Sequence, residues 1–471
     1  MKHNYFILII CFLLIGCPPL PEESDVIIKN ANIIDMVTGE IKKRDVFIAK
    51  GRITQIVSEG AKDIYYGSKE TINAKGKFLL PGFWDNHVHF RGGDSLINAN
   101  KNFLKLFIAN GITTVRDAGG DLTSSVMEWK KQIAGGDLVG PTIFTSGPKI
   151  DGPDATWAGS LEVENDGDIQ RALDSLQSIP TDFVKLYESR LSGENYLATI
   201  KEAEKRGLIT SGHMPFTVTL EETVAAGIDA IEHLYYIMKG CAANEAAVTE
   251  KMKSGEIGFW GAMPLLLKGY SENVAQKTFL NLKENDVYVV PTLHIGETLS
   301  YLDEHDHSDD SYLDYMGKGI LKTYQGRIQR AMQSSEKQIN DRKALQEFFG
   351  KLAKSLNDSG VGLLAGSDSG AFNSYTYPGI SLHKELEQMV ANGISPLEAL
   401  RTSAYNGAKF LEKDSDYGTL SVGKIADLVL LEKNPLQDVK QTQNIHTVIK
   451  GTTVLNKKDL KELLASAVNN N

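Results

Sequence analysis

Residues that can bind metal ions follow several short apolar segments of the sequence. After the first of these segments, His87 and His89 are spaced i and i+2. Residues at this spacing point to the same side of an extended chain, so both imidazoles can reach one metal ion. Four later segments end in further candidates, which are Lys185, His213, His233 and Asp368. Imidazole and carboxylate ligands suit Zn²⁺ and related divalent ions, so these residues indicate a metal site.

Taken singly, each candidate has an ordinary structural explanation. A histidine beside an apolar segment is usually a core or surface residue. Asp368 could cap a helix, and Lys185 could lay its stem along apolar surface with its amine in solvent. All six residues follow or end a predicted strand on the same side, and this agreement favours one shared site.

Alternating strands and helices would position this site. Eight apolar segments have the length of strands, at 78–80 continuing into Trp84, 113–115, 142–145, 183–186, 208–210, 230–231, 287–290 and 362–364. Helical patterns separate them, as where Leu382, Leu386 and Met389 share one helix face. The alternation predicts an α/β fold, a (β/α)8 TIM barrel whose active residues lie at the strand ends.

Strand-rich segments flank the predicted barrel at both ends of the chain. Residues 17–80 and 413–471 contain short β-branched runs. Two such segments can pair in one small sheet domain. We therefore divide the chain into a removed leader at 1–16, a split β domain at 17–80 and 413–471, and a barrel at 81–412.

The N-terminus predicts export. Lys2 precedes an apolar run at 5–15, which is too short to span a bilayer and is typical of a signal peptide. Leu14-Ile15-Gly16-Cys17 resembles a bacterial lipobox, in which Cys17 is lipidated; a plain signal peptide is the alternative. We expect this lipid alone to anchor the protein to a bacterial membrane, facing the periplasm or the exterior. Cys241 would be the one other cysteine of the mature chain, which excludes an intrachain disulfide.

Composition limits the partners. The chain has 471 residues, of which 42% are hydrophobic and 23% charged, as in ordinary globular proteins. It has 50 Lys and Arg against 60 Asp and Glu, a formal net charge of -10. Because nucleic-acid binding needs a basic surface, we expect no nucleic-acid partner. A small molecule or a short peptide is the expected substrate.

The sequence around the site resembles the amidohydrolase superfamily over essentially the whole mature chain. Leu80-Pro-Gly-Phe-Trp-Asp-Asn-His-Val-His89 is similar to its strand-one signature. The segment from Gly423 to Pro435 is similar to part of its composite β-sandwich. The segments that begin at Pro378 and Gly393 are similar to the imidazolonepropionase-like and Xaa-Pro dipeptidase-like branch.

The resemblance implies a site for two divalent metal ions. His87, His89 and Asp368 would hold one ion, and His213 and His233 the other. Lys185, converted to a carbamate by CO₂, would bridge them, since a buried lysine is neutral and reactive. Zn²⁺ is the expected metal, with Mn²⁺, Co²⁺ and Fe²⁺ as alternatives. Metal-bridging hydroxide would attack a carbonyl, and Asp368 would shuttle the proton to the leaving amine.

The expected activity is hydrolysis of an amide bond in a dipeptide or an N-acyl amino acid. A hydrolase of cyclic amides, lactones or other esters, and a non-catalytic lipid-anchored binding protein, are the alternatives. The candidates for substrate contact are Tyr187, Tyr235, Arg116, Trp157 and His294. Arg116 could equally join a structural ion-pair network with Asp117. The segments 239–286 and 300–345 could form a lid or pack outside the barrel.

Overall fold

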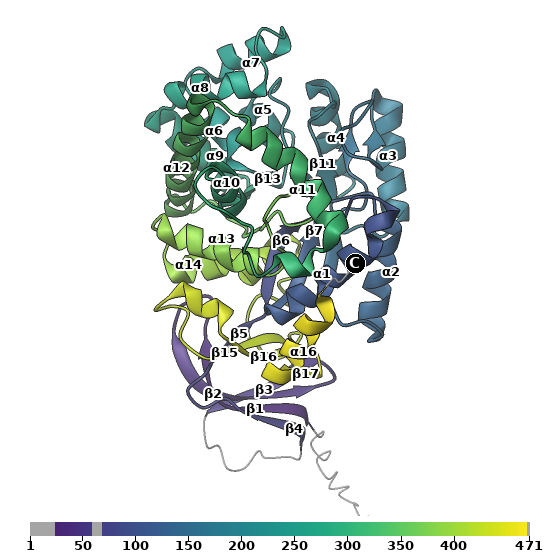
Figure 1. Ribbon diagram of the computed structural model, residues 1–471, viewed down its shortest axis with the longest axis vertical. Coiled ribbons are helices and arrows are strands. Elements are labelled where there is room, and N and C mark those ends of the chain that lie inside the picture. Colours follow the sequence, from purple (N-terminus) through teal and green to yellow (C-terminus); the bar gives the residue numbers. More distant parts are fainter. Residues whose placement is uncertain (1–23, 59–67, 469–471) are drawn as a thin grey trace, which may run out of the picture.

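The computed structural model describes residues 24–58 and 68–468. Within these residues, a barrel of parallel strands surrounded by helices carries a smaller β-sheet domain at one end (Figure 1). The predicted leader and Cys17 lie outside the described residues. No helix of the described part has the length and apolar character needed to cross a membrane.

Parallel strands form the barrel wall. In chain order they are β6 (Phe83–Val88), β7 (Ile112–Asp117), β8 (Thr142–Thr145), β9 (Ile150–Asp151), β10 (Leu161–Glu162), β11 (Val184–Leu186), β12 (Thr210–Gly212), β13 (Ala230–Glu232) and β14 (Tyr288–Val290). The extended segment after residue 361 closes the wall. Its Leu364 N–H donates to Val289 O at 2.9 Å on one side, and Asp368 N–H donates to His87 O at 2.8 Å on the other. The predicted TIM barrel is confirmed.

Two predicted strands are placed differently by the structure. The first barrel strand begins at Phe83, whereas residues 78–80 belong to β5 (Phe78–Pro81) of the other sheet. Gly82 separates the two strands, and a Cβ there would come within 2.3 Å of the Thr113 hydroxyl. The fifth strand is β12, two residues later than predicted. The apolar runs correctly predicted a strand near each position. The bounds of each strand, and the sheet to which it belongs, depend on hydrogen bonds to neighbouring strands.

The second sheet joins the two ends of the chain, as predicted. Its strands are β1 (Ser24–Ile34), β2 (Ile41–Ala49), β3 (Arg52–Ser58), β4 (Ser68–Asn73), β5, β15 (Asp427–Leu431), β16 (Ile445–Lys450) and β17 (Thr453–Asn456). The order β17-β16-β15-β5-β1-β2-β3 places β15 beside β5, in antiparallel register. Alternate residues of these strands, such as Val26, Ile28, Leu428 and Leu430, form a separate hydrophobic core. The pairing of β5 with β15 holds the segments that enter and leave the barrel side by side in one sheet.

Helices follow most barrel strands, and further helices lie in the inserted segments and after the last strand of the other sheet. They are α1 (Ile97–Ala109), α2 (Thr123–Gly135), α3 (Asp166–Ser178), α4 (Gly193–Lys205), α5 (Leu220–Ala225), α6 (Leu234–Gly240), α7 (Glu245–Lys253), α8 (Phe259–Gly269), α9 (Glu272–Glu284), α10 (Leu293–Ser300), α11 (Gly317–Met332), α12 (Glu336–Asp358), α13 (Ile380–Ala391), α14 (Pro396–Leu400), α15 (Asn406–Phe410) and α16 (Lys457–Ala467). The predicted face of α13 is buried at Leu382, Leu386 and Met389. Ser395 caps α14 by accepting from Glu398 N–H, with Pro396 in the first turn.

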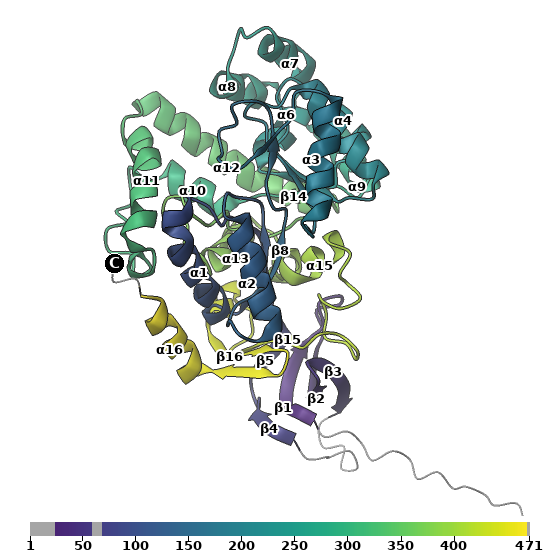
Figure 2. The same ribbon diagram turned by 90° about the vertical axis from the view of Figure 1, so that its right-hand side faces the viewer.

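The two segments of undecided role lie around one part of the barrel mouth. Residues 239–286 include α7, α8 and α9, and residues 300–345 include α11 and the start of α12. Both α11 and α12 contact α10 (Figures 1 and 2). Residues of α8, α11 and α12 line one pocket with His233 and Asp368. The segments therefore shape the entrance to the predicted site.

Candidate metal centre

His87, His89 and Asp368 converge inside the barrel mouth. His87 lies in β6 and His89 follows that strand, while Asp368 follows the closing segment with a φ of 56°. Asp368 Oδ1 lies 3.1 Å from His89 Nε2 and 3.4 Å from His87 Nε2. One ligand atom from each of these three buried residues lies within 4.8 Å of the other two. We refer to these three residues as the first ligand group.

His213 and His233, the second histidine pair, face the first ligand group. The ring centroid of His233 lies 4.7 Å from that of His213 and 5.3 Å from that of His87. His233 has a φ of 71°, a backbone conformation that is uncommon outside glycine. Such local strain is concentrated at functional sites. Four imidazoles thus lie together at one end of the barrel.

Lys185 lies in β11, and its side chain is fully buried. Its amine touches the carboxylate of Glu232, which also accepts from the Arg116 guanidinium at 3.0 Å. Burial, and then the charges of Lys149 and Arg116, hold the pKa of Lys185 well below its ordinary value of 10.5. This shift favours the neutral amine, which is the form that reacts with CO₂.

Each imidazole has an oxygen atom beside its Nδ1 atom. His89 Nδ1 lies 3.0 Å from the Gly119 carbonyl oxygen. His233 Nδ1 lies 2.7 Å from the Thr292 hydroxyl. In proteins, metal-binding histidines commonly use their second nitrogen in this way, which fixes the ring and its tautomer. The Nε2 atoms of these two rings are left to bind a metal ion.

Two glutamates lie beside the other imidazoles. His213 Nδ1 lies 2.8 Å from Glu188 Oε2, and His87 Nδ1 lies 3.5 Å from Glu232 Oε1, but neither pair has the geometry of a hydrogen bond. A carboxylate that accepts from this nitrogen raises the basicity of a ligand imidazole, and these two carboxylates are near enough for that role. The sequence analysis did not single out either glutamate. The acidic residue within the apolar strand before His233 was the available signal for Glu232.

Burial sets the protonation states of the ligand residues. It is the largest cause that lowers the pKa of His87 to about 4, and the pKa of His89, His213 and His233 well below 6.5. The rings are therefore neutral at pH 7, as metal ligands must be. Burial alone would raise the pKa of Asp368, but His87 and His89 hold it well below 3.8. The carboxylate is ionised.

This donor set fits divalent metal ions. It combines neutral imidazoles with an ionised carboxylate, as Zn²⁺ and similar ions require of their N and O ligands, and the buried amine of Lys185 belongs to the same barrel end. Within the described residues, His87 Nε2 is buried without a hydrogen-bond partner. Polar atoms in that state are rare in proteins and call for a bound partner.

Three of the candidates for substrate contact lie near the metal centre. Tyr235 lines a pocket that His233 also lines. The ring of Tyr187 lies 4.5 Å from that of His213, and the ring of Trp157 lies 6.3 Å from that of Tyr187. Tyr235 packs against Trp260 of α8 and Phe349 of α12. Trp157 lies in the loop that follows β9, beside Tyr187.

Arg116 and His294 are not among the residues that line the pocket shared by Tyr235 and His233. Arg116 is 1% exposed, and its guanidinium donates to Glu232 at 3.0 Å and to Ser211 at 2.9 Å. These contacts hold the Arg116 guanidinium inside the barrel, beside Glu232 rather than Asp117, and its expected pairing with a substrate carboxylate stays a prediction. His294 is not part of the pocket wall, and its backbone N–H donates to Glu385 at 2.7 Å.

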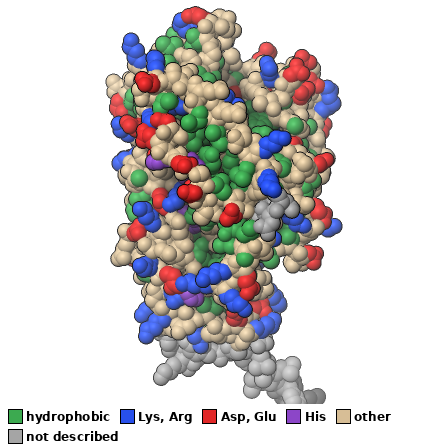
Figure 3. All heavy atoms as spheres, viewed as in Figure 1, with side chains coloured by type: hydrophobic (Ala, Val, Ile, Leu, Met, Phe, Trp, Pro, Cys, Tyr) green, Lys and Arg blue, Asp and Glu red, His purple; other side chains and the backbone are tan. Residues whose placement is uncertain are grey.

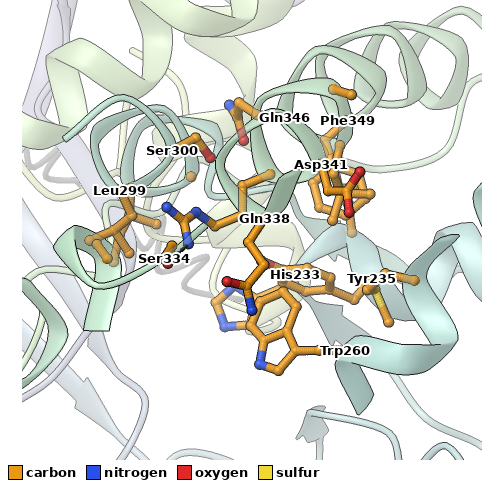
Figure 4. Close-up of a pocket in the computed structure, with 18 of the residues that line it drawn as sticks. His233, Tyr235, Trp260, Leu299, Ser300, Ser334, Gln338, Asp341, Gln346 and Phe349 are labelled. Atoms are coloured by element: carbon orange, nitrogen blue, oxygen red, sulfur yellow. Dashed lines mark hydrogen bonds between the residues drawn. The ribbon is translucent and has the colours of Figure 1, made fainter. Parts of the chain in front are cut away.

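A pocket of about 760 Å³ opens beside the metal centre (Figure 4). His233 and Asp368 form part of its wall, and α8, α10, α11 and α12 supply most of the rest. Hydrophobic side chains gather along the middle of the face seen in Figure 3, the face on which α11 lies in Figure 1. The volume is in the range of pockets for small-molecule ligands.

Residues 78–454 match the sequence profile of the Amidohydrolase family, which is more than half of the chain. The chain belongs to the amidohydrolase family. An ochratoxinase of Aspergillus niger is 23% identical to this amidohydrolase over 481 residues, covering 90% of this chain and 84% of the relative.

Two further comparisons differ in extent. An adenine deaminase of Thermosipho africanus is 40% identical to this amidohydrolase over 91 residues, but the match spans 19% of this chain and 14% of the deaminase. The solved structure of a Xaa-Pro dipeptidase with bound methionine in the active site has a TM-score of 0.67 and 18% identity. That match covers 92% of this chain and 99% of the dipeptidase, and it shows a shared fold.

Proposed function

We propose that this amidohydrolase is a metal-dependent enzyme that hydrolyses the amide bond of a dipeptide or an N-acyl amino acid. The observation that carries the proposal is the convergence of four neutral imidazoles, the ionised Asp368 and the buried amine of Lys185 at one barrel end. The likeness in fold to a Xaa-Pro dipeptidase supports a substrate of this class.

The residues present would hold two divalent ions. The first ligand group would bind one ion and the second histidine pair the other, with Lys185 between them as its carbamate. Zn²⁺ is the metal that we propose for both positions. When bound, such ions act as Lewis acids toward a carbonyl and make water nucleophilic at neutral pH.

Asp368 is the residue that we propose to move the proton. The side-chain amide of Asn373 donates to Asp368 Oδ1 at 2.7 Å, which holds the carboxylate in place. An amine leaves an amide poorly as an anion, so a proton must reach the leaving nitrogen. Asp368 would accept this proton from the attacking water and deliver it to the nitrogen.

The test is turnover of dipeptides and N-acyl amino acids by protein that begins at Pro18 and is loaded with Zn²⁺ in the presence of bicarbonate. Asp368→Asn should lower kcat by roughly 10²- to 10⁴-fold, the usual contribution of a general acid–base. Asp341→Asn, in the wall of the same pocket, is the matched control and should keep near wild-type turnover.

The outcomes separate the candidate functions. Wild-type turnover by Asp368→Asn would exclude the proton-transfer role. Turnover of lactones or other esters, with no turnover of amides, would replace the proposed activity with that of an ester hydrolase. Absence of both bound metal and turnover after reconstitution would favour a binding protein.

A further inference from the structure

The pocket beside the metal centre has an apolar wall, to which the 239–286 segment contributes Trp260 and Met263. The rings of Tyr235 and Phe349 lie 5.0 Å apart between centroids, and those of Tyr235 and Trp260 lie 6.1 Å apart. Leu299 and Met263 also line the pocket. Figure 4 shows Tyr235 and Trp260 beside His233, so this apolar wall begins at the metal centre.

Trp260 indicates that part of the apolar wall is available to a ligand. Its side chain is 62% exposed, the largest exposed fraction among the large hydrophobic residues of the described chain together with Val422. An apolar ligand group that packs on an exposed tryptophan buries a large apolar area, and this burial favours binding. The pocket therefore suits a bulky apolar group on the substrate.

One cation stands out in this pocket. Arg327 lies on α11 and lines the pocket together with Asp368 and Tyr235. No hydrogen bond or salt bridge joins its guanidinium to another residue of the described ranges. Asp368 is the charged group that attracts it most strongly. Since Asp368 is a predicted metal ligand, bound metal would neutralise that carboxylate and leave Arg327 without a counter-charge.

The neighbouring cations are less suited to meet a substrate in this pocket. The amine of Lys149 is buried, lies 4.9 Å from the centroid of the Trp157 ring, and is not part of the pocket wall. Arg116 is occupied inside the barrel. Arg330 lines the pocket one turn further along α11, but it is exposed to solvent.

We propose that Arg327 is the residue that recognises a carboxylate of the substrate, while the apolar wall receives a bulky group of the same molecule. This inference rests on the proposed amide-hydrolase function. A guanidinium presents paired N–H donors that match the two oxygens of a carboxylate, and such hydrogen bonds are strong where water is excluded. The substrate class is thus an N-acyl amino acid or dipeptide with a free carboxylate and a large, preferably aromatic, side group.

The test compares N-benzoyl-phenylalanine with its carboxamide, which has the same shape but no charge. Wild type, Arg327→Met and the control Arg330→Met are each assayed for kcat/KM toward both compounds. Wild type should prefer the acid, and Arg327→Met should lower kcat/KM for the acid by roughly 10- to 150-fold, the range for a hydrogen bond to a charged group. Its kcat/KM for the carboxamide should stay near the wild-type value, and Arg330→Met should resemble wild type.

Binding to the metal-loaded proteins is measured in parallel by calorimetry, so that the inference does not depend on turnover. If wild type hydrolyses neither compound, selective weakening of acid binding in Arg327→Met would support Arg327 while the amide-hydrolase function fails. If wild type hydrolyses both compounds and Arg327→Met keeps the full preference for the acid, the role of Arg327 is excluded while the function stands. Failure of wild type to bind the acid more tightly than the carboxamide would also overturn the inference.

Discussion

Replacing Glu232 by glutamine should destabilise the barrel and weaken metal binding together. Glu232 is fully buried, and its carboxylate accepts from the Arg116 guanidinium at 3.0 Å and from the Ser211 hydroxyl at 2.6 Å. Glutamine keeps the size of the side chain but removes its charge. Breaking a buried ion pair costs about 3–5 kcal/mol. Because Asp85 also attracts Arg116, we expect a loss near the lower limit, about 3 kcal/mol.

The same substitution removes the carboxylate that lies 3.5 Å from His87 Nδ1. Loss of such a partner typically lowers metal affinity by about 10- to 100-fold. Urea unfolding of the metal-free protein measures the first effect, and competition with a chelator measures the second. Glu385→Gln is the matched control, because Glu385 is a buried carboxylate whose hydrogen bonds within the described residues come from the backbone N–H groups of Leu293 and His294. It should leave metal affinity unchanged.

A double variant decides whether the pairing with Arg116 is responsible. Arg116→Met combined with Glu232→Gln removes both charges, so its loss of stability should be clearly smaller than the sum of the two single losses. Additive losses would refute the assigned ion pair. Unchanged metal affinity in Glu232→Gln would refute the orienting role toward His87.

The remaining predictions concern other parts of the chain. Lys185→Ala should lower the metal content from about two ions per chain to about one, measured by elemental analysis after purification with bicarbonate; retention of both ions would exclude the carbamate bridge. His383 lies buried between Thr442 and Asn110, and burial lowers its pKa from 6.5 to about 4. The unfolded chain therefore takes up a proton at higher pH than the folded one, so this residue should cost about 3 kcal/mol of stability as the pH falls from 6.5 to 4. In urea unfolding across that range, His383→Gln should show a shallower pH dependence than wild type, and an identical slope would contradict the assignment. Cys17→Ser should abolish incorporation of labelled fatty acid in bacteria, whereas persistent labelling would exclude Cys17 as the lipidated residue.

Much of the barrel could be predicted because each strand is a local apolar run with its own boundaries. The runs at 113–115 and 142–145 are both strands in the structure. Residues 78–80 were placed both in the first barrel strand and in the split β domain, since their apolar side chains suit either sheet. Leu79 and Leu80 pair with β15, which lies far away in the sequence. A local sequence pattern does not predict this pairing with β15.

By itself, the sequence indicated which residues gather at the candidate site, because a histidine or aspartate at the end of a parallel strand has few other places to go in a barrel. The four histidines and Asp368 were singled out on this basis, their division between two metal ions was what the family resemblance implied, and the structure brings the residues together. Only the tertiary structure decided their surroundings. Arg116 meets Glu232 inside the barrel, and Arg327 reaches the pocket from α11. In both cases residues that are distant in the chain come together. Side-chain packing decides such positions, whereas backbone periodicity does not predict them.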